Sequence, residues 1–378
     1  MEAWLEKGFA WIPHPVKKVT FGEGKIGELA EIVNQQSRVV LITSPSVVRS
    51  GLIDQVKGHL KTVAALEVYE GVRPHSPIAT VEDVRRLVKK IGATHVISVG
   101  GGSSIDTTKG VILDYLDSPN KPFHVAIPTT LSGGEYGKDV GLTDGNKKKI
   151  TSDVRVVPDL VILDPIAAVT APLSIFMPSG MNAFAHCVEG LASVKGNAIG
   201  DALFLHSARL LYSSLFELAE KPDDLVQRGR AQAGALMAAC IGLGGIPKGI
   251  EHALAHVVGG RWKVPHAIAH SIMIAPCMRY NADTVGWAHA MIGETIGVPG
   301  VPKMAPQDAS FATAEAVDGL LARMKIPRRL AEVGVPRDDL KNGAVDAFDD
   351  LYLHSNPKKI TEASDVLGIL EDAWGRPL

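Results

Sequence analysis

Up to about Asp164 the chain alternates short apolar, β-branched runs with amphipathic segments of helical period. Residues 39–43 and 95–99 are runs of the first kind, and residues 80–91 place their apolar side chains at the spacing of one helix face. This alternation is the pattern of βαβ units around a sheet. We therefore predict an α/β domain with a mostly parallel sheet over residues 1–164.

Strand signals fade after a stretch that is interrupted by four prolines, Pro158, Pro165, Pro172 and Pro178. Long helical patterns rich in Ala, Leu and Gly follow, and they continue from about residue 310 to the end. We predict a boundary near residue 165 and an all-α domain over residues 165–378. A chain of 378 residues is long enough for two such domains.

Several classes of function are disfavoured by composition. The formal net charge is −2 and no long Lys/Arg run is present, so we expect no nucleic-acid partner. The longest apolar stretch, residues 233–246, is shorter than a membrane span, and we expect a buried helix there rather than a membrane anchor. The three cysteines are widely spaced and the first residues do not form a secretory signal, so we expect a cytoplasmic protein.

Three glycines follow the run at 95–99 and open the next helical segment. Gly100, Gly101 and Gly102 let a backbone approach a ligand closely, and we expect Ser103 or Ser104 to cap a helix whose free N–H groups favour a phosphate. A tight turn would need the same residues. Asp106, placed by the sequence in the first helical turn, either complements the helix dipole or accepts a bond from a cofactor. Lys109 has the pattern of a packed or solvated helix residue.

Small polar residues also follow two other predicted strands. Thr129, Thr130 and Ser132 come after the run at 124–127 and are suited either to turn chemistry or to binding a diphosphate or nicotinamide amide. Ser44 follows the run at 39–43, at the position where NAD-selective sites often carry an acid. Because serine does not repel a 2′-phosphate, the sequence allows both NAD(H) and NADP(H).

Six residues in the second half are spaced like a metal site that lacks its carboxylate. They form three i, i+4 pairs, which would each share one helix face: Asn182 and His186, His252 and His256, His266 and His270. Histidine suits Zn and Fe, and an acidic ligand would normally complete such a site. Asparagine brings only a neutral carbonyl oxygen.

These elements, in this order, resemble the iron-containing alcohol dehydrogenase superfamily, relatives of dehydroquinate synthase, over most of the chain. The resemblance rests on residues 21–24, 70–77, 100–106 and 127–130, and on the His-rich stretch 252–270. Within the superfamily the chain most resembles the maleylacetate reductases, which carry Ser-Gly-Met-Asn-x-x-Ala-His as in residues 179–186. Residues 131–144 depart from the pattern expected of these reductases.

The resemblance implies an NAD(P)H-dependent reductase that transfers hydride to a ketone, with maleylacetate or a related oxo-dicarboxylate of aromatic catabolism as substrate and 3-oxoadipate as product. It implies a homodimer with its active site in the cleft between the domains. It places His186, His252 and His266 at the three metal-histidine positions, Asn182 in the place of the carboxylate, and His256 near the nicotinamide.

Two chemistries fit this set of residues. Iron or zinc could be held by Asn182, His186, His252 and His266 and polarise the substrate. Alternatively, the same histidines could act without metal as His⁺ donors of hydrogen bonds and protons. The sequence favours the second, because exchange of an anionic for a neutral ligand weakens a metal site.

Further alternatives remain open. A metal-dependent alcohol or hydroxyacid dehydrogenase that tolerates Asn182, and a dinucleotide-binding regulator without turnover, both fit the sequence. For a dicarboxylate substrate, Lys138, Lys248, Arg261 and Lys263 are the candidate anchors, although each could equally be a solvated charge.

Overall fold

The computed structural model describes residues 15–145, 147–239, 241 and 245–375. Its contacts divide the chain into two compact units. A sheet unit contains residues 15–176 together with Asp223–Gln232, and a helical unit contains Met177–Pro222 and the described residues from Ala233 onward. By this criterion the first helices beyond residue 165 group with the sheet, whereas our boundary at 165 assumes two consecutive blocks. A functional domain boundary at residue 165 remains a prediction.

The sheet unit is built on six parallel strands in the order β1-β8-β5-β4-β2-β3. The predicted α/β class with a mostly parallel sheet is thus confirmed. Its strands and helices are β1 (Lys18–Phe21), α2 (Leu29–Ile32), β2 (Arg38–Thr43), α3 (Pro45–Arg49), α4 (Leu52–Gly58), β3 (Ala65–Tyr69), α5 (Ile78–Ile91), β4 (His95–Gly100), α6 (Gly102–Ile112), β5 (Phe123–Pro128), β6 (Asp139–Asp144), β7 (Lys147–Ser152), β8 (Leu160–Leu163) and α7 (Pro165–Val169).

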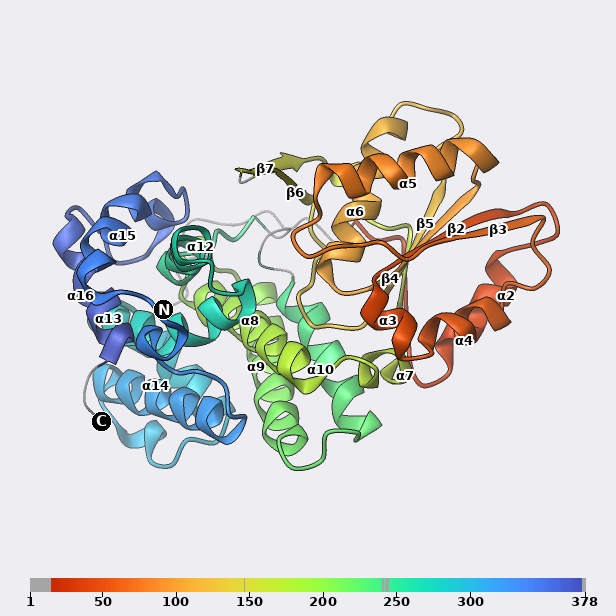
Figure 1. Cartoon of the computed structure of the whole chain (residues 1–378). Coiled ribbons are helices and arrows are strands. Elements are labelled where there is room, and N and C mark those ends of the chain that lie inside the picture. Colours follow the sequence, from red (N-terminus) through yellow and green to blue (C-terminus); the bar gives the residue numbers. More distant parts are fainter. Residues whose placement is uncertain (1–14, 146, 240, 242–244, 376–378) are drawn as a thin grey trace. The chain divides into compact units, whose positions relative to one another are not determined.

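Both faces of this sheet are covered by helices, as Figure 1 shows. Successive strand residues point to opposite faces. Val39 and Leu41 of β2 therefore pack in a core with residues of α2, α3 and α4, while Val40 and Ile42 pack in a second core with residues of α5 and α6. This double burial explains why the strands are continuous apolar runs in the sequence.

The carboxyl ends of β2, β4 and β5 lie next to one another. Thr43 of β2 pairs with Val99 of β4, and Gly100 of β4 pairs with Pro128 of β5. The strand order reverses at β2 and β4, because β3 lies beyond β2 while β4 and β5 continue in the other direction. Ligands of open parallel sheets bind at such a reversal, outside the carboxyl ends.

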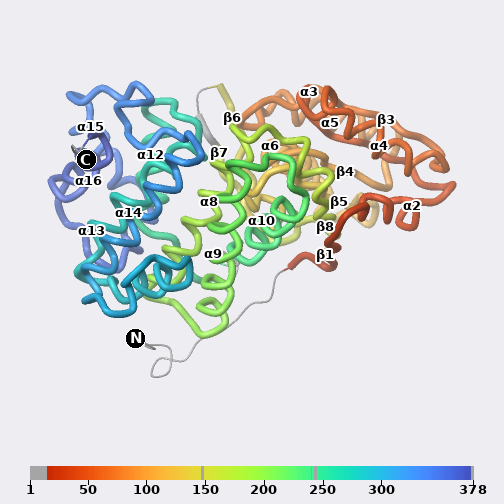
Figure 2. The backbone as a smooth tube through the Cα atoms, turned by 90° about the horizontal axis from the view of Figure 1, so that it is seen from below, coloured from red at the N-terminus to blue at the C-terminus, as the bar shows by residue number. Residues whose placement is uncertain are grey.

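The helical unit contains no strand among the residues described, in line with the predicted all-α second half. Figures 1 and 2 show α12, α13, α14 and α16 gathered together. Its helices are α8 (Leu173–Ala192), which begins in the sheet unit, α9 (Ala198–Leu218), α10 (Leu225–Ala238), which crosses between units, α12 (Ile250–Trp262), α13 (His266–Thr295), α14 (Pro306–Arg323), α15 (Leu340–Asp346) and α16 (Ala363–Gly375).

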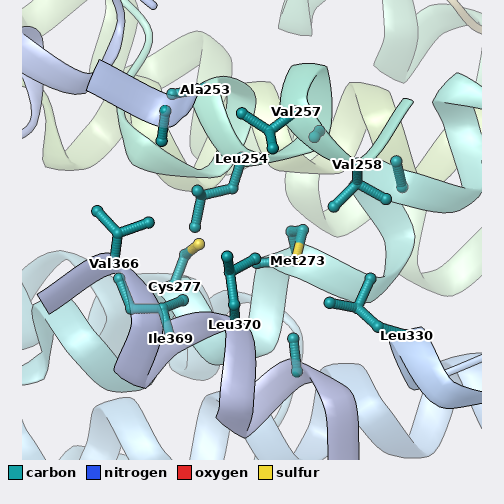
Figure 3. Close-up of a cluster of buried hydrophobic side chains, with 14 of the residues drawn as sticks. Ala253, Leu254, Val257, Val258, Met273, Cys277, Leu330, Val366, Ile369 and Leu370 are labelled. Carbon is teal, nitrogen blue, oxygen red and sulfur yellow. The ribbon is translucent and has the colours of Figure 1, made fainter. Parts of the chain in front are cut away.

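One buried cluster holds α12 in place, and Figure 3 shows it in close-up. Leu254 and Val258 of α12 pack with Met273 of α13 and with Ile369 and Leu370 of α16. Because Leu254 and Val258 share one face with i, i+4 spacing, the side chains at 252 and 256 lie on a different face of the same helix.

Two features differ from or extend beyond the sequence analysis. The antiparallel hairpin of β6 and β7 was not predicted. The helix expected over residues 233–246 is described only in part, because α10 ends at Ala238 and residues 240 and 242–244 lie outside the described residues. Residues 1–14, in which we expect no secretory signal, also lie outside the described residues. Within the part of the chain described, no helix is both long and apolar enough to cross a membrane.

Candidate active site

The six polar residues of the second half lie on three helices of the helical unit, in the pairs that their spacing predicted. Asn182 and His186 lie on α8, His252 and His256 on α12, and His266 and His270 on α13. Asn182, His186, His252 and His270 are buried.

The five histidine rings form one continuous cluster. His186 stacks on His252 with ring centroids 4.8 Å apart, and His252 lies 4.5 Å from His270. His270 meets His266 edge-on at 4.3 Å, and His266 stacks on His256 at 5.8 Å. The structure thus brings together histidines that lie up to 84 positions apart in the sequence, the separation of His186 and His270.

Three carboxylates that the sequence analysis did not select support this cluster. Glu189 of α8 accepts a hydrogen bond from His252 Nδ1 at 2.6 Å, and Glu251 of α12 lies 2.9 Å from the same nitrogen. Glu251 also accepts from His270 Nδ1 at 2.8 Å. Asp350 accepts from His256 Nδ1 at 2.7 Å.

Two of these carboxylates carry a local signal in the sequence. Glu189 and Glu251 are single acids inside otherwise apolar helical segments, which is an informative anomaly because a buried acid needs a partner. Asp350 lies 94 positions from His256 and has no such signal.

Burial sets the charge of the cluster. It lowers the pKa of His186, His252 and His270 well below the usual value, and the positive charge of Lys248 lowers all three further. Burial also raises the pKa of Glu189 to about 7 and that of Glu251 well above its usual range. This direction is unfavourable to the expectation that His186 and His252 act as His⁺ donors, which remains a prediction.

The bond to Glu189 also fixes the tautomer of His252. An ionised Glu189 can only accept, so with it the proton of the neutral ring lies on Nδ1 and Nε2 keeps a lone pair. A carboxylate behind the far nitrogen of a histidine is the usual arrangement around a metal-ligating imidazole.

Three buried acceptors test whether a metal ion fits. Asn182 Oδ1, His186 Nε2 and His252 Nε2 have no hydrogen-bond partner among the residues described. An amide oxygen and two imidazole nitrogens without donors suit a divalent cation such as Fe²⁺ or Zn²⁺, or hydrogen-bond donors of a bound ligand. The chemistry of these atoms thus allows a metal, but His186, His252 and His266 do not together form a group of described His, Cys, Asp and Glu side chains whose ligating atoms all lie within 4.8 Å of one another. His266, the fourth candidate, has its Nε2 3.1 Å from His270 Nε2.

A second buried group also offers metal-ligating atoms close together. Glu251, His252 and His270 each place one such atom within 4.8 Å of the others. These atoms already hydrogen-bond to one another in pairs through Glu251, so this group is better described as support for the cluster.

The four candidate carboxylate anchors differ in their surroundings. Lys248 Nζ lies 5.6 Å from the centre of the Tyr352 ring, which also contacts His252 and His256. Arg261 is bound to Asp339 and Asp346, and Lys263 donates to the carbonyl oxygen of Gly260. Lys138 is an exposed residue of the sheet unit.

The predicted cofactor-binding residues meet at the carboxyl ends of the strands in the sheet unit. A Cβ atom on Gly101 would lie 3.1 Å from the Thr130 side chain, and one on Gly102 would lie 3.3 Å from Ser132 Oγ. Thr129 N–H donates to the carbonyl oxygen of Gly100 at 3.0 Å. The glycines thus allow the two loops to lie in contact. Ser44 follows β2 and its Oγ lies 2.9 Å from Ser46 Oγ.

Two details of the glycine loop differ from expectation. The residue that precedes α6 is Gly101, so Ser103 and Ser104 lie within the helix and neither caps it. Asp106 is the fifth residue of α6 and lies beyond its first turn, with Oδ1 3.9 Å from Lys109 Nζ. Both differences from the prediction have one cause, because α6 begins at Gly102, two residues earlier than a cap at Ser103 would require.

Comparison with known proteins agrees with both halves of this description. Residues 15–165 match the profile of "Iron-containing alcohol dehydrogenase", and residues 176–374 match that of "Fe-containing alcohol dehydrogenase family, C-terminal". A maleylacetate reductase of Sphingobium indicum is 30% identical, with 98% of each chain covered. A lactaldehyde reductase of Escherichia coli K12 is 28% identical, with 94% of this chain and 97% of the relative covered.

A solved structure shows the same fold. The maleylacetate reductase of Agrobacterium tumefaciens superposes with a TM-score of 0.84 at 25% identity, over 97% of this chain and 98% of the other. The resemblance inferred from the sequence motifs is therefore confirmed. The chain belongs to the iron-containing alcohol dehydrogenase family of oxidoreductases.

Proposed function

We propose that the protein is an NAD(P)H-dependent reductase of an oxo-dicarboxylate, with maleylacetate as the first substrate to test. The observation that carries this proposal is a buried histidine cluster with the neutral residue Asn182 one turn before His186 on α8, where the family's metal-dependent alcohol dehydrogenases were expected to have a carboxylate. The similarity to maleylacetate reductases supports the same substrate class.

The chemistry of this substrate refines our expectation about hydride. Addition of hydride to the ketone carbon of maleylacetate would give a hydroxy acid. Formation of 3-oxoadipate instead requires hydride at the alkene carbon β to the ketone, which moves the π electrons toward the ketone oxygen and gives an enolate. A proton added to the alkene carbon α to the ketone then re-forms the C=O bond and gives the saturated ketone. The expectation that hydride reaches the ketone carbon is therefore wrong for this substrate. Both reactions need a group that stabilises charge on the carbonyl oxygen.

We assign proton delivery to His256. Its side chain is 32% exposed, whereas that of His252 is 1% exposed, and its Nδ1 is backed by Asp350. The remaining ring nitrogen, Nε2, is thereby oriented by a fixed partner. We assign recognition of a substrate carboxylate to Lys248, because Arg261 already has two carboxylate partners.

A second candidate function follows from the three buried acceptors. Asn182, His186 and His252, with His266, would hold Fe²⁺ or Zn²⁺ in a metal-dependent alcohol or hydroxyacid dehydrogenase. A bound metal ion would act as a Lewis acid toward a carbonyl oxygen. The similarity to a lactaldehyde reductase is consistent with this alternative.

The deciding experiment measures NADH and NADPH oxidation at 340 nm with maleylacetate, other oxo-acids and lactaldehyde, on protein of measured metal content. Turnover of maleylacetate that survives removal of metal by a chelator supports the first proposal. Turnover of aldehydes or alcohols that is lost on chelation and restored by Fe²⁺ or Zn²⁺ supports the second. Tight NADH binding without turnover of any compound would favour a dinucleotide-binding regulator. The homodimer remains a prediction, to be tested by sedimentation.

A further inference from the structure

Lys109 is a cation buried in the sheet unit. Its side chain is 0% exposed, and its ammonium group donates hydrogen bonds to three backbone carbonyl oxygens, those of Gly134 at 3.0 Å, Gly137 at 2.8 Å and Asp139 at 2.6 Å. These bonds use all three donors of the ammonium group. Since the carboxylate oxygen Oδ1 of Asp106 is 3.9 Å away, neutral carbonyl dipoles are the direct hydrogen-bond partners of the charge.

A charge in this position is unfavourable unless it makes strong contacts. Burial lowers the pKa of Lys109, and Asp106, Asp139 and Glu135 counteract this only in part. An apolar side chain of similar length would fill the same space without desolvation of a charge. Packing alone therefore does not explain a lysine at this position.

The three bonds link the two loops of the predicted cofactor site. Lys109 is on α6, whose first residue is Gly102 of the glycine loop. Its acceptors belong to residues 134–139, the continuation of the loop that carries Thr130 and Ser132. The loops lie in contact near the strand ends, where Cβ atoms on Gly101 and Gly102 would crowd Thr130 and Ser132.

We infer that Lys109 is a positioning residue for the nicotinamide cofactor: its ammonium group serves as a fixed internal cation that holds residues 134–139 against α6, and so keeps Thr130 and Ser132 facing the glycine loop. This inference rests on the proposed function, because it requires that the two loops bind NAD(P)H. It adds a residue that lies outside the ligand-contacting set named above.

The consequence is a specific effect on cofactor binding. Loss of the cation removes three charge-assisted hydrogen bonds, which are stronger than hydrogen bonds between neutral groups. A fraction of their energy is enough to change the loop geometry. We expect the Kd for NADH to rise at least about tenfold in Lys109→Met, with a much smaller change in kcat at saturating NADH.

The test is a fluorescence titration of NADH with the full-length protein and three variants. Lys109→Met keeps the side-chain length and removes the charge, Lys109→Ala leaves space for a small amine, and Lys121→Met is the control, since Lys121 donates to a single backbone carbonyl at an exposed site. We expect propylammonium to restore NADH affinity in Lys109→Ala, and 1-propanol, which has a similar shape and no charge, to fail.

Each outcome has a separate meaning. Wild-type NADH affinity in folded Lys109→Met would overturn the inference, and so would equal rescue by propanol, which would indicate simple filling of space. If Lys109→Met does not fold, Lys109→Arg gives the test, because a planar guanidinium retains the charge but not the geometry of three converging bonds; an unchanged Kd in that variant would overturn the inference. Failure of the wild-type protein to bind NADH would instead refute the proposed function.

Discussion

Replacement of Glu189 by glutamine tests whether the carboxylates behind the histidines matter for activity. Glu189 Oε2 accepts from His252 Nδ1 at 2.6 Å, and Oε1 accepts from the backbone N–H of Glu251 at 2.7 Å. Both neighbours are donors. Glutamine has one accepting oxygen, so its NH₂ group must face either the imidazole N–H or the backbone N–H.

The magnitude follows from these two bonds. A hydrogen bond to a charged group contributes roughly 1.5–3 kcal/mol, and replacement of a carboxylate behind a functional histidine typically lowers activity about 10- to 100-fold. We therefore expect kcat of Glu189→Gln to fall about 10- to 100-fold, because His252 loses its fixed tautomer and orientation. The Kd for NADH should stay within about twofold, since the predicted cofactor loops belong to the sheet unit.

The assay is NADH oxidation at 340 nm with the substrate identified for the wild-type protein, together with circular dichroism to confirm folding. Glu189→Asp keeps the charge and should recover part of the activity. Glu217→Gln removes an exposed carboxylate from α9 of the same unit and should behave as wild type. Wild-type kcat in folded Glu189→Gln would refute the argument that this carboxylate positions His252.

Three further predictions concern metal, pH and cofactor choice. Asn182→Asp replaces one of the three buried acceptors by an anionic carboxylate and should raise the affinity for Zn²⁺ by about tenfold or more. The measurement is metal analysis after equilibrium dialysis, and unchanged metal content would argue against a metal position there. Burial lowers the pKa of His289 to about 4, so between pH 6.5 and pH 4 this side chain is protonated in the unfolded chain and neutral in the folded chain. The contribution of His289 to the free energy of unfolding therefore falls by about 2 kcal/mol between pH 7 and pH 5. Urea unfolding of His289→Asn should lack this loss, and an identical pH dependence would contradict the prediction. Ser44→Asp places a charge beside a cofactor 2′-phosphate and should raise KM for NADPH about tenfold while KM for NADH stays nearly constant.

The fold could be predicted well from the sequence because its signals are local. The strand expected at 39–43 is observed at Arg38–Thr43, and the helix expected at 80–91 is observed at Ile78–Ile91. Apolar periodicity and glycine placement determine local structure over a few residues, so strands and helices can be predicted from them without knowledge of tertiary contacts. The β6–β7 hairpin was missed because β6 is largely half-exposed and residues 149–152 of β7 are all exposed, which gives no clear alternation of apolar and polar side chains.

The candidate site was predictable only in part. The i, i+4 spacing placed the histidines on the correct helices, since it depends on helix geometry alone. The pKa of His186, His252 and His270 depends on burial and on the charge of Lys248, and their hydrogen-bond partners Glu189 and Glu251 reach them from other turns and other helices. Spacing carries no information about burial or these partners, so the lowered pKa of His186 and His252 could not be predicted from the sequence.

The carboxylates also change what Asn182 implies. Taken alone, an amide in place of a carboxylate leaves a site with only neutral ligands and weak affinity for a cation. The structure places two acids one imidazole away, because Glu189 and Glu251 both contact His252 Nδ1 while His252 Nε2 remains without a partner among the described residues. A carboxylate bonded to Nδ1 makes Nε2 more basic. Burial raises the pKa of both acids, and a cation bound at His252 Nε2 would favour their ionised forms. Negative charge absent at position 182 would then be partly supplied through His252, and a site with asparagine in this position can still attract a cation or a strong hydrogen-bond donor. Double replacement of Glu189 and Glu251 by glutamine should therefore reduce Zn²⁺ affinity more in the wild-type background than in Asn182→Asp, because that variant already carries a charge at position 182. Equal losses of Zn²⁺ affinity in the two backgrounds would show that the acids act independently of position 182.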